Sequence, residues 1–547
     1  MSNKCEVQSP GAVYTPDPIA KAIISRCEEL LEKRNNLRIL EPSVGDGAFV
    51  RALDSSNINI SSVNVVDLDH LVIEQLQSSR NGFRFPLRIH NCDYLEYAKK
   101  STDDPHPNLI VGNPPFIRYH NYSESFKQNT NLLAHSREGS FNYMKNAWMA
   151  FLISAENLLA PDGLLAFVLP YEIMTVDYGQ SVLQSMQEAF HRIDIFVADQ
   201  KAFPEIEQDA VIFFGDRTGQ SESGLFIHRT SSFTTLQSMG GRRVLLLDGP
   251  RRGLEMNAFL LDKTELDELR GIRQGCASIS DYASSTPGLV TAANDFFIRS
   301  MDDVRKLGLE DYARPVLRRS SFTIPNPIYD KADHKRDACR APSQFLCFQG
   351  KFNKLSKRAR DYILEGRRQD LHLRYKCRNR ENWYEVPLAN PKPGFLFKRS
   401  HSHPRIIINR AQVMTTDGAY GITPHDDYSI DALCFSFFNS LTMLFAEIDG
   451  RFYGGGVLEL TPREFRGLPL VYKKPSEKEF NDFLKIHRLA KGKPEPILDF
   501  GDAWLGEMLN IDGKTLQMIR KCWEKVRVHR MRHGNIIRAT GSLKQSV

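Results

Sequence analysis

The sequence predicts an α/β protein in which a doubly wound, Rossmann-like sheet is followed by a C-terminal α+β domain. Two observations support this fold class. Over about the first 215 residues, short apolar runs alternate with stretches of helical spacing, and that alternation is typical of an open α/β sheet. From about residue 291 onward, basic and aromatic residues interleave instead.

The elements of the first part can be placed in order. Residues 17–33 carry apolar side chains at helical spacing, with Thr15 or Asp17 as the cap and Pro18 near the first turn. A further helix over residues 148–159 ends before Pro161. Ligands of such sheets bind at the carboxyl ends of the strands. The predicted strands cover residues 38–40, 63–66, 109–111, 164–169, 193–196 and 210–214.

Charge is divided unevenly along the chain. Residues 1–240 hold 20 lysines and arginines against 29 aspartates and glutamates, whereas residues 241–547 hold 52 against 37. A basic second part is typical of a surface that meets a polyanion, most simply a nucleic acid, although uneven solvated charge is an alternative. We expect a first domain over residues 1–240, a connector over residues 241–290 and a basic domain over residues 291–547.

Composition excludes several classes of protein. The chain is 41% hydrophobic and 25% charged, as globular proteins are, and no apolar run approaches the roughly 18 residues that span a bilayer. The N-terminus lacks the apolar stretch of a signal peptide. The nine cysteines are scattered without a Cys-x-x-Cys pair, and His401 and His403 have no further ligands at metal-binding spacing. These features favour a cytoplasmic protein with reduced thiols and no metal.

The sequence Asn113-Pro114-Pro115-Phe116 follows directly after an apolar run at residues 108–112. It predicts a buried strand ending in a rigid loop, because consecutive prolines fix φ and cannot continue a ladder. An amide and an aromatic ring on such a loop suit the binding of a planar group that carries an exocyclic amino group. An ordinary strand-to-loop stop is the alternative, since Asn and Pro are turn formers.

Polar residues follow other predicted strands ahead of this loop. Residues 41–49 form a Gly-containing loop that enters a helix, with neither a G-x-G-x-x-G pattern nor a Walker lysine. Asp67 is placed to accept hydrogen bonds from ribose hydroxyls, and Asp93-Tyr94 to hold an adenine and cover its ring. Each acid alone could equally cap a helix. Their ordered succession predicts a nucleoside site whose ligand lacks phosphates.

With these motifs the chain resembles the S-adenosylmethionine-dependent DNA adenine-N6 methyltransferases of bacterial restriction-modification systems. The class is the one whose cofactor motifs precede the catalytic motif and a C-terminal target-recognition domain. The resemblance is strong over about the first 215 residues and loose over the rest. It implies a methyltransferase sheet in the first domain. The matching residues are Tyr14-Thr15-Pro16, residues 41–49, Asp67-Leu68-Asp69, Asp93-Tyr94, residues 113–116 and Ala202-Phe203-Pro204.

The resemblance implies that S-adenosylmethionine is the cofactor and that no metal is required. The implied cofactor residues are Thr15 and Glu41 at the methionine end, Ser43 and Gly45 in the Gly-containing loop, Asp67 at the ribose, and Asp93 with Tyr94 at the adenine.

The resemblance also implies the catalytic residues. A target adenine flipped out of the duplex would stack on Phe116, with Phe203 on its other side or edge. The Asn113 side-chain oxygen and the Pro114 carbonyl would accept the amino hydrogens, and Pro115 would keep the loop rigid. Phe116 stands where the family commonly has Tyr, which keeps the ring and removes a hydroxyl. For Phe203, a place in the core is an alternative.

The implied partner is double-stranded DNA, with any cognate restriction endonuclease on a separate chain. Residues 518–538 are rich in arginine and lysine, and they predict either a helix along the phosphate backbone or a disordered basic tail. The candidate DNA-binding residues lie among aromatic side chains and are Arg374, Lys376, Arg378, Arg380, Lys398 and Arg399.

Two other functions stay open from the sequence. The same loop serves enzymes that methylate RNA bases or the glutamine of translation release factors, but the large basic part argues against the glutamine enzymes. A non-catalytic DNA-recognition subunit of a phage-defence complex is the second alternative. Intact Asn113, Asp67 and Asp93 argue against that subunit.

Overall fold

The computed structural model describes residues 13–31, 34–102, 104–135, 144–203, 209–219, 221–236, 241–244, 256, 259–323, 326–388, 390–453 and 455–532. The chain forms two compact units. The first comprises Met1–Lys263, Arg451–Gly456 and His529–Val547, and the second comprises Thr264–Gly450 and Val457–Val528. Two short segments from the second half of the sequence therefore belong to the first unit. The domain boundaries expected at residues 240 and 290 stay predictions.

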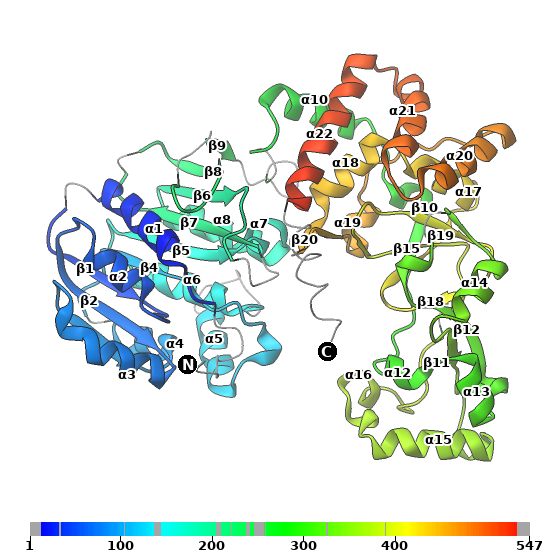
Figure 1. Cartoon of the computed structure of the whole chain (residues 1–547), viewed down its shortest axis with the longest axis horizontal. Coiled ribbons are helices and arrows are strands. Elements are labelled where there is room, and N and C mark those ends of the chain that lie inside the picture. Colours follow the sequence, from blue (N-terminus) through cyan, green and yellow to red (C-terminus); the bar gives the residue numbers. More distant parts are fainter. Residues whose placement is uncertain are drawn as a thin grey trace, which may run out of the picture. The chain divides into compact units, whose positions relative to one another are not determined.

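A nine-stranded sheet forms the centre of the first unit, in the order β3-β2-β1-β4-β5-β7-β6-β8-β9 (Figure 1). Strands β1 to β5 are parallel, and β7 lies antiparallel between β5 and β6. The chain order reverses between β1 and β4, which makes that point the switch where open α/β sheets bind ligands. The strands are β1 (Leu37–Glu41), β2 (Ile60–Asp67), β3 (Leu87–Asn91), β4 (Leu109–Gly112), β5 (Leu164–Pro170), β6 (Arg192–Ala198), β7 (Ala210–Asp216), β8 (Gly224–Thr230) and β9 (Gly241–Val244).

Helices cover both faces of this sheet, so the doubly wound prediction is confirmed. Alternate residues of β4 enter different cores, with Leu109 and Val111 in one and Ile110 in the other, as the two-residue period of a strand requires. The first core takes residues from α1 (Asp17–Leu30), α2 (Ala48–Asp54) and α3 (His70–Ser79). The second takes residues from α4 (Tyr94–Lys100), α5 (Glu124–His135), α6 (Ala147–Leu158), α7 (Glu172–Thr175) and α8 (Asp177–Ala189).

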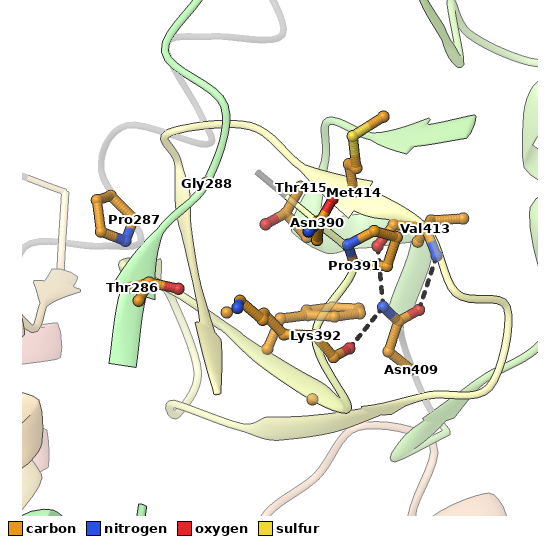
Figure 2. A pocket seen from close by; sticks show the side chains of 13 residues that line it. Thr286, Pro287, Gly288, Asn390, Pro391, Lys392, Asn409, Val413, Met414 and Thr415 are labelled. Atoms are coloured by element: carbon orange, nitrogen blue, oxygen red, sulfur yellow. Dashed lines mark hydrogen bonds between the residues drawn. The ribbon is translucent and has the colours of Figure 1, made fainter. Parts of the chain in front are cut away.

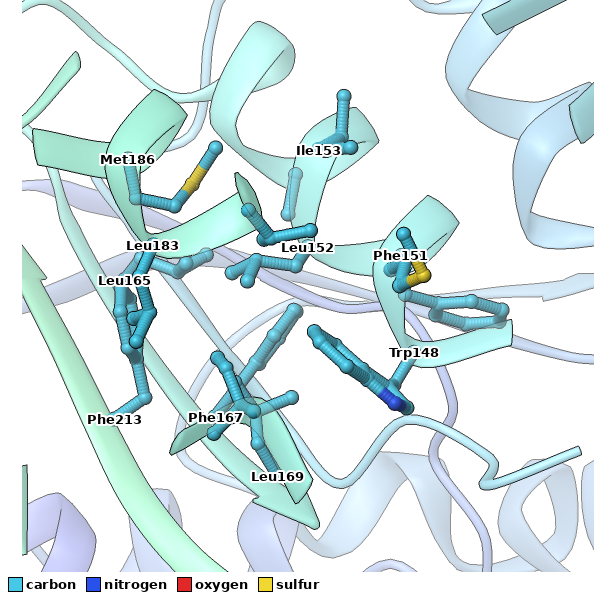
Figure 3. Close-up of a cluster of buried hydrophobic side chains, with 14 of the residues drawn as sticks. Trp148, Phe151, Leu152, Ile153, Leu165, Phe167, Leu169, Leu183, Met186 and Phe213 are labelled. Atoms are coloured by element: carbon cyan, nitrogen blue, oxygen red, sulfur yellow. The ribbon is translucent and has the colours of Figure 1, made fainter. Parts of the chain in front are cut away.

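Helix α6 is buried almost all round in the second core (Figure 3). Trp148 is fully buried in the same cluster as Phe167 of β5 and Phe213 of β7. The Trp148 indole N–H donates to Oε1 of Glu172 at 2.9 Å, and Asn146 Nδ2 donates to the same oxygen at 2.9 Å. Helix α6 and the segment after β5 are thus held together near the carboxyl end of the sheet.

The second unit mixes helices with small sheets, which confirms the α+β prediction. One sheet has the order β10-β19-β15-β17-β13 and another the order β11-β14-β12-β18. Its strands are β10 (Ala283–Pro287), β11 (Ile298–Arg299), β12 (Ala313–Leu317), β13 (Ile328–Tyr329), β14 (Gln344–Leu346), β15 (Gly394–Phe397), β16 (Arg399–Ser400), β17 (Ile406–Asn409), β18 (Met414–Thr415), β19 (Ala419–Pro424) and β21 (Val457–Glu459). The helices are α10 (Lys263–Gln274), α11 (Ile279–Tyr282), α12 (Asn294–Phe297), α13 (Met301–Leu307), α14 (Lys331–Ala338), α15 (Lys357–Arg368), α16 (Tyr375–Arg378), α17 (Ile430–Phe437), α18 (Ser440–Asp449), α19 (Pro462–Arg466), α20 (Glu477–Ala490), α21 (Glu495–Leu509) and α22 (Gly513–Met531).

A single asparagine braces the loop before β15 (Figure 2). Asn409 Nδ2 donates to the carbonyl oxygens of Lys392 and Val413, both at 2.9 Å, and its Oδ1 accepts from Val413 N at 3.1 Å. The hollow beside it holds only about 20 Å³, which is room for about one water molecule. This region therefore serves packing of the unit.

Helix α22 covers most of the described part of the basic C-terminal segment. Arg532 follows the helix, and Arg538 lies outside the described residues. In the helix, Trp523 is buried, and several of its cations are held by acids of the same unit. Arg520 lies 3.2 Å from Asp499, and Lys525 lies 2.5 Å from Glu265. These pairs tie the helix into its own unit, although Lys525 itself remains exposed.

Among the described helices, none alone has the length and apolar composition to cross a membrane, although the bent pair α17 and α18, at 80°, has them jointly.

Candidate active site

A cavity of about 660 Å³ lies where the switch between β1 and β4 predicts a ligand site. Its walls come from the segment before α1 and from the carboxyl ends of β1, β2, β3 and β4. Residues 113–116 and all of the expected cofactor residues line it together. Those residues are Thr15, Glu41, Ser43, Gly45, Asp67, Asp93, Tyr94, Asn113, Pro114, Pro115 and Phe116.

The loop after β1 is shaped by glycine. Gly45 and Gly47 have φ values of +51° and +80°, a left-handed region that costs other residues energy. A Cβ on Gly45 would meet the ring of Tyr14 at 2.9 Å. The Gly45 N–H donates to Oδ2 of Asp67 at 2.9 Å, so the loop is fixed to the end of β2 and its backbone can approach a ligand closely.

Asp67 and the residue after it form a polar and an apolar wall side by side. The other carboxylate oxygen of Asp67 accepts from Asp69 N at 3.0 Å. Leu68 lines the cavity with its side chain 73% exposed, and Leu71 of α3 lies exposed in the same wall. An exposed apolar pair beside a fixed carboxylate fits a ligand that joins a planar ring to a sugar.

Glu41 is the most unusual group in the cavity. It is fully buried, and neither carboxylate oxygen has a hydrogen-bond partner among the described residues; the buried Thr15 hydroxyl also lacks one. Burial, followed by the charges of Asp67 and Asp46, raises the pKa of Glu41 well above its ordinary value, against an opposing effect of Arg51. A buried carboxylate without a partner is costly unless a cation pairs with it, so this end of the cavity fits a cationic group of a ligand.

Asp93 has both a structural and a ligand-facing side. Its Oδ1 accepts from Leu95 N at 2.8 Å and Glu96 N at 3.3 Å, which caps α4. Burial raises the pKa of Asp93, and the two backbone hydrogen bonds oppose that shift. The capping role considered for this acid is therefore real, and because both caps use Oδ1, Oδ2 remains for a ligand in the cavity that Asp93 lines.

Asn113 is held by hydrogen bonds on two sides, one through its side chain and one through its main chain. Its side-chain Nδ2 donates to the main-chain carbonyl of Val13 at 2.9 Å. The main-chain carbonyl of Asn113 accepts from Ser43 Oγ at 3.1 Å. Because a carbonyl can only accept, the bond to Val13 decides which end of the amide is nitrogen. Oδ1 is consequently the end of the side chain that can accept hydrogen bonds in the cavity.

Aromatic rings extend from Phe116 into the segment after it. The ring of Tyr122 packs edge-on against that of Phe126, with 4.8 Å between the ring centroids. The centroid of the Phe126 ring lies 6.4 Å from that of Phe151 in α6. Phe151 in turn lies 4.8 Å from the ring of Tyr94. All five side chains line the cavity, so it has an aromatic wall beside the Asn113 loop.

Phe203 lies elsewhere. It is buried in the first hydrophobic core and is not among the residues that line the cavity. The structure thus places it as the core alternative describes, and its contact with a target base stays a prediction.

Sequence reasoning missed several residues of the site. Val13 acts through a main-chain carbonyl, for which a sequence has no signal. Phe151 was assigned to a helix without a role. Tyr122 and Phe126 lie four residues apart, shortly after residues 113–116, and that spacing could have indicated the aromatic wall.

Two family models match most of the chain. Residues 52–203 match the Eco57I restriction-modification methylase family, and residues 255–505 match Type II methyltransferase M.Eco57I, C-terminal domain. The chain is also 22% identical over 494 residues to Type II methyltransferase M.AccI of Acinetobacter calcoaceticus, covering 87% of this chain and 88% of that protein. The chain belongs to the Type II restriction-modification DNA methyltransferases.

Two further relatives of this Type II methyltransferase are informative. It is 29% identical over 140 residues to the tRNA1(Val) (adenine(37)-N6)-methyltransferase of Tolumonas auensis, covering 25% of this chain and 54% of that protein. Its fold is similar to that of the Type IIL restriction-modification enzyme MmeI, solved in complex with DNA. The TM-score is 0.54 at 14% identity, over 93% of this chain and 75% of that chain.

In the second unit of this methyltransferase, the candidate DNA-binding residues are not equivalent. Lys376 and Arg378 are exposed on α16, where Tyr375 is 69% exposed and the Arg378 guanidinium lies 5.3 Å from its ring. Arg374 is exposed and donates to the carbonyl of Ala292 at 2.9 Å. This short helix presents cations around an aromatic ring, a pattern typical of nucleic-acid contacts.

Arg380 differs from its neighbours. It is half-buried, and its guanidinium donates to the carbonyls of Val290 at 2.7 Å, Thr291 at 3.1 Å and Trp383 at 3.1 Å. Burial lowers its pKa. These bonds give Arg380 a packing role within the unit.

Lys398 and Arg399 line a second cavity, of about 590 Å³, in the same unit. Arg399 pairs with Glu459 at 2.5 Å, and the Lys398 ammonium lies 5.1 Å from the ring of Tyr420. Arg318 and Arg319, at the end of β12, line the same cavity and were not predicted. These four lysine and arginine side chains line one cavity because the ends of separate strands lie next to one another there.

Among the described residues, no group of three or more His, Cys, Asp or Glu side chains is arranged to hold a metal ion.

Proposed function

We propose that this protein transfers a methyl group from S-adenosylmethionine to the N6 amino group of an adenine flipped out of double-stranded DNA. The observation that carries the proposal is the meeting of two half-sites in one cavity. The unpartnered Glu41 and the oriented Asn113 line the same space. One fits the cationic end of an amino-acid-bearing nucleoside, and the other fits a conjugated amino group.

The cofactor end is derived from the buried groups. Glu41 would pair with the α-amino group of the methionine portion, with the Thr15 hydroxyl beside it. Asp67 would accept from the ribose hydroxyls while its bonds to Gly45 and Asp69 keep it in place. Leu68 and Leu71 would cover the adenine, and Asp93 Oδ2 would accept from its amino group. The bound cofactor supplies an electrophilic methyl group on a sulfonium.

At the target end, this chain's residues prepare the nucleophile. The lone pair of an adenine amino group is delocalised into the ring. Asn113 Oδ1 and the Pro114 carbonyl would accept the two amino hydrogens and draw the lone pair out of conjugation. Phe116 would stack on the base. An amide cannot act as a base, so the proton leaves to water after transfer, and the rate derives from positioning and electrostatics.

DNA would meet the second unit through two sets of cations. One set surrounds Tyr375 on α16, and the other lines the cavity with Arg318 and Arg319. Cations of this kind contact phosphates and set affinity, whereas base contacts set the recognition sequence.

Adenine as the substrate base is supported by asparagine before the prolines, where family resemblance associates serine with cytosine-N4. The tRNA relative is named for adenine-N6 methylation. That relative also keeps RNA as the second candidate substrate, although its likeness covers only 25% of this chain.

A labelled-transfer assay tests the proposal. The protein is incubated with S-adenosylmethionine carrying a tritiated methyl group and with unmethylated duplex DNA or RNA, and the products are digested to nucleosides. We expect label in N6-methyldeoxyadenosine from DNA. Label in N4-methyldeoxycytidine, or in RNA alone, would contradict the proposal.

A further inference from the structure

Two large apolar side chains lie exposed on the second unit, only two residues apart in the chain. Leu373 is 60% exposed and Tyr375 is 69% exposed. They flank Arg374 at the junction between the 3-10 turn Leu371–Leu373 and α16. Single exposed apolar residues are ordinary on protein surfaces, so the meaning of this exposed pair depends on what surrounds it.

The exposed pair lies within the strongly basic segment 351–380. This segment holds 11 lysines and arginines against 3 aspartates and glutamates, so its net charge of +8 exceeds the +6 of the whole chain. Arg374, Lys376 and Arg378 are exposed, and none of them forms an ion pair with an acid among the described residues. Arg399 of the second cavity, by contrast, pairs with a glutamate. The cations around the exposed pair therefore fit a polyanion.

The backbone that carries the exposed pair is fixed on both sides. Three consecutive carbonyls, those of residues 290–292, accept hydrogen bonds from two arginines. Arg374 donates to the last of them at 2.9 Å, and Arg380 donates to the other two at 2.7 Å and 3.1 Å. Leu371 and Cys377 are buried, with 5% and 0% exposure. Because the segment is already ordered, little conformational entropy is lost when it binds a partner.

The chemistry of the exposed pair suits bases better than phosphates. The Arg378 guanidinium lies 5.3 Å from the centroid of the Tyr375 ring, and most of that side chain is still exposed. Nucleic-acid bases stack on aromatic rings whatever their sequence. Apolar side chains such as leucine insert between base steps, unstack them and bend the duplex. Cations alone would be enough for contact with phosphates, so the ring and the leucine are left to contact the base stack.

We propose that Leu373 and Tyr375 form a wedge that enters the stack of the bound DNA duplex and opens one base step, while Arg374, Lys376 and Arg378 contact phosphates beside that step. The inference rests on the proposed function, because it takes duplex DNA as the substrate. All residues that line the active-site cavity belong to the first unit, whereas the wedge belongs to the second. The wedge therefore acts on the duplex in addition to the binding of the target adenine in the cavity.

DNA bending and salt dependence test the wedge together. The full-length protein is titrated into a duplex that contains the methylated sequence and carries a donor and an acceptor dye at its two ends. We expect Tyr375→Ala to weaken binding by about 5-fold to 150-fold and to reduce the rise in energy transfer that reports bending. The slope of log K against log salt stays unchanged, because no phosphate contact is removed.

Three further variants sharpen the test. Tyr375→Phe keeps the ring and should retain both affinity and bending, whereas Leu373→Ala should lose part of each. Leu388→Ala is the matched control, because Leu388 is a 50% exposed leucine of the same unit. It lies in the stretch 384–392, which has one acid and one lysine, and this variant should bind and bend DNA as the wild type does. All of these side chains are exposed, so Tm should change little in each variant.

The outcomes separate the wedge from the proposed function. A wild-type protein that transfers no methyl group to DNA would contradict the proposed function itself. A wild type that methylates DNA but leaves it unbent would overturn the wedge alone. The same conclusion would follow if Tyr375→Ala bent DNA as the wild type does, if it lowered the salt slope, or if Leu388→Ala reproduced its loss.

Discussion

The side chain of Asn113 donates a 2.9 Å hydrogen bond to the main-chain carbonyl of Val13, 100 residues earlier in the chain. The bond joins the segment before α1 to the loop after β4, so the N-terminal segment that brings Thr15 to the cavity also orients the Asn113 amide. It leaves Oδ1 as the acceptor for a target amino group. The proposed cofactor end and the proposed base end of the cavity are therefore linked by one contact.

Asn113→Ala removes that acceptor without opening the core. We expect kcat for methyl transfer to fall by about 100-fold or more, since losing one oriented group that stabilises a transition state costs this much. Cofactor binding, measured by calorimetry, stays within about two-fold. Near-normal turnover would contradict the role of Asn113.

Glu41→Gln separates stability from function. A buried carboxyl with a raised pKa disfavours folding at neutral pH, so its neutral isostere is expected to raise the free energy of unfolding of the ligand-free protein by about 1–3 kcal/mol. The same change weakens S-adenosylmethionine binding, because the carboxylate that pairs with the cationic amino group of the ligand is lost. Denaturant titration and calorimetry measure the two effects. A variant that is less stable and binds normally would refute the assignment.

The raised pKa of Glu41 also predicts the pH dependence of binding. Below that pKa the free site is protonated, so pairing with a cation releases a proton, and affinity rises with pH by up to about ten-fold per unit. Above the pKa of Glu41 the affinity for the cofactor no longer changes with pH through this group. The free energy of unfolding of the ligand-free protein changes in the opposite direction. It falls as the pH rises from the pKa of Glu41 in the unfolded chain toward its pKa in the folded chain. Glu41→Gln should remove the pH dependence that Glu41 gives to cofactor affinity and to the free energy of unfolding.

Phe116 is predicted to act by stacking. Phe116→Ala should lower kcat/KM for DNA by about 10-fold to 100-fold, since stacking of a base on an aromatic ring contributes about 1–3 kcal/mol. Phe116→Tyr keeps the ring and should stay within about three-fold of wild type by the same reasoning. Steady-state kinetics on one DNA duplex measures kcat/KM for both variants and for the wild type. Equal losses in both variants would argue against stacking.

Lys376 and Arg380 provide a matched pair for the DNA interface. Lys376→Ala should weaken DNA binding and reduce the slope of log K against log salt by about 1, because one phosphate contact is lost. Arg380→Ala should instead lower Tm, since its guanidinium bonds three main-chain carbonyls. Salt titrations by fluorescence anisotropy distinguish them. An unchanged slope in Lys376→Ala would exclude this lysine from the interface.

Six of the nine strands in the sheet of the first unit were predicted, because buried strands are continuous apolar runs followed by turn residues. Strands β3, β8 and β9 were not predicted. The run at residues 109–111 became β4, Leu109–Gly112. The position of β7 between β5 and β6 was not predictable, since pairing partners depend on contacts far apart in sequence. The same holds for Val13, whose role uses a backbone atom.

Burial explains the remaining differences. Arg374 and Arg380 look alike in sequence, yet one is exposed and the other half-buried against carbonyls of residues 290 and 291. Glu41 was predicted as a cofactor residue, but its lack of a partner follows only from the packing around it. Phe203 matched a target-base motif in the sequence, but that match did not determine which side of the sheet its ring would enter.

The most direct measurement of the central claim is sequencing with modification detection at single-base resolution, after incubation of the purified protein with S-adenosylmethionine and unmethylated genomic DNA. We expect N6-methyladenine at one position of one recurring short sequence, and none with Asn113→Ala. Unmodified DNA from a preparation that binds the cofactor, or methylation of cytosine instead, would contradict it.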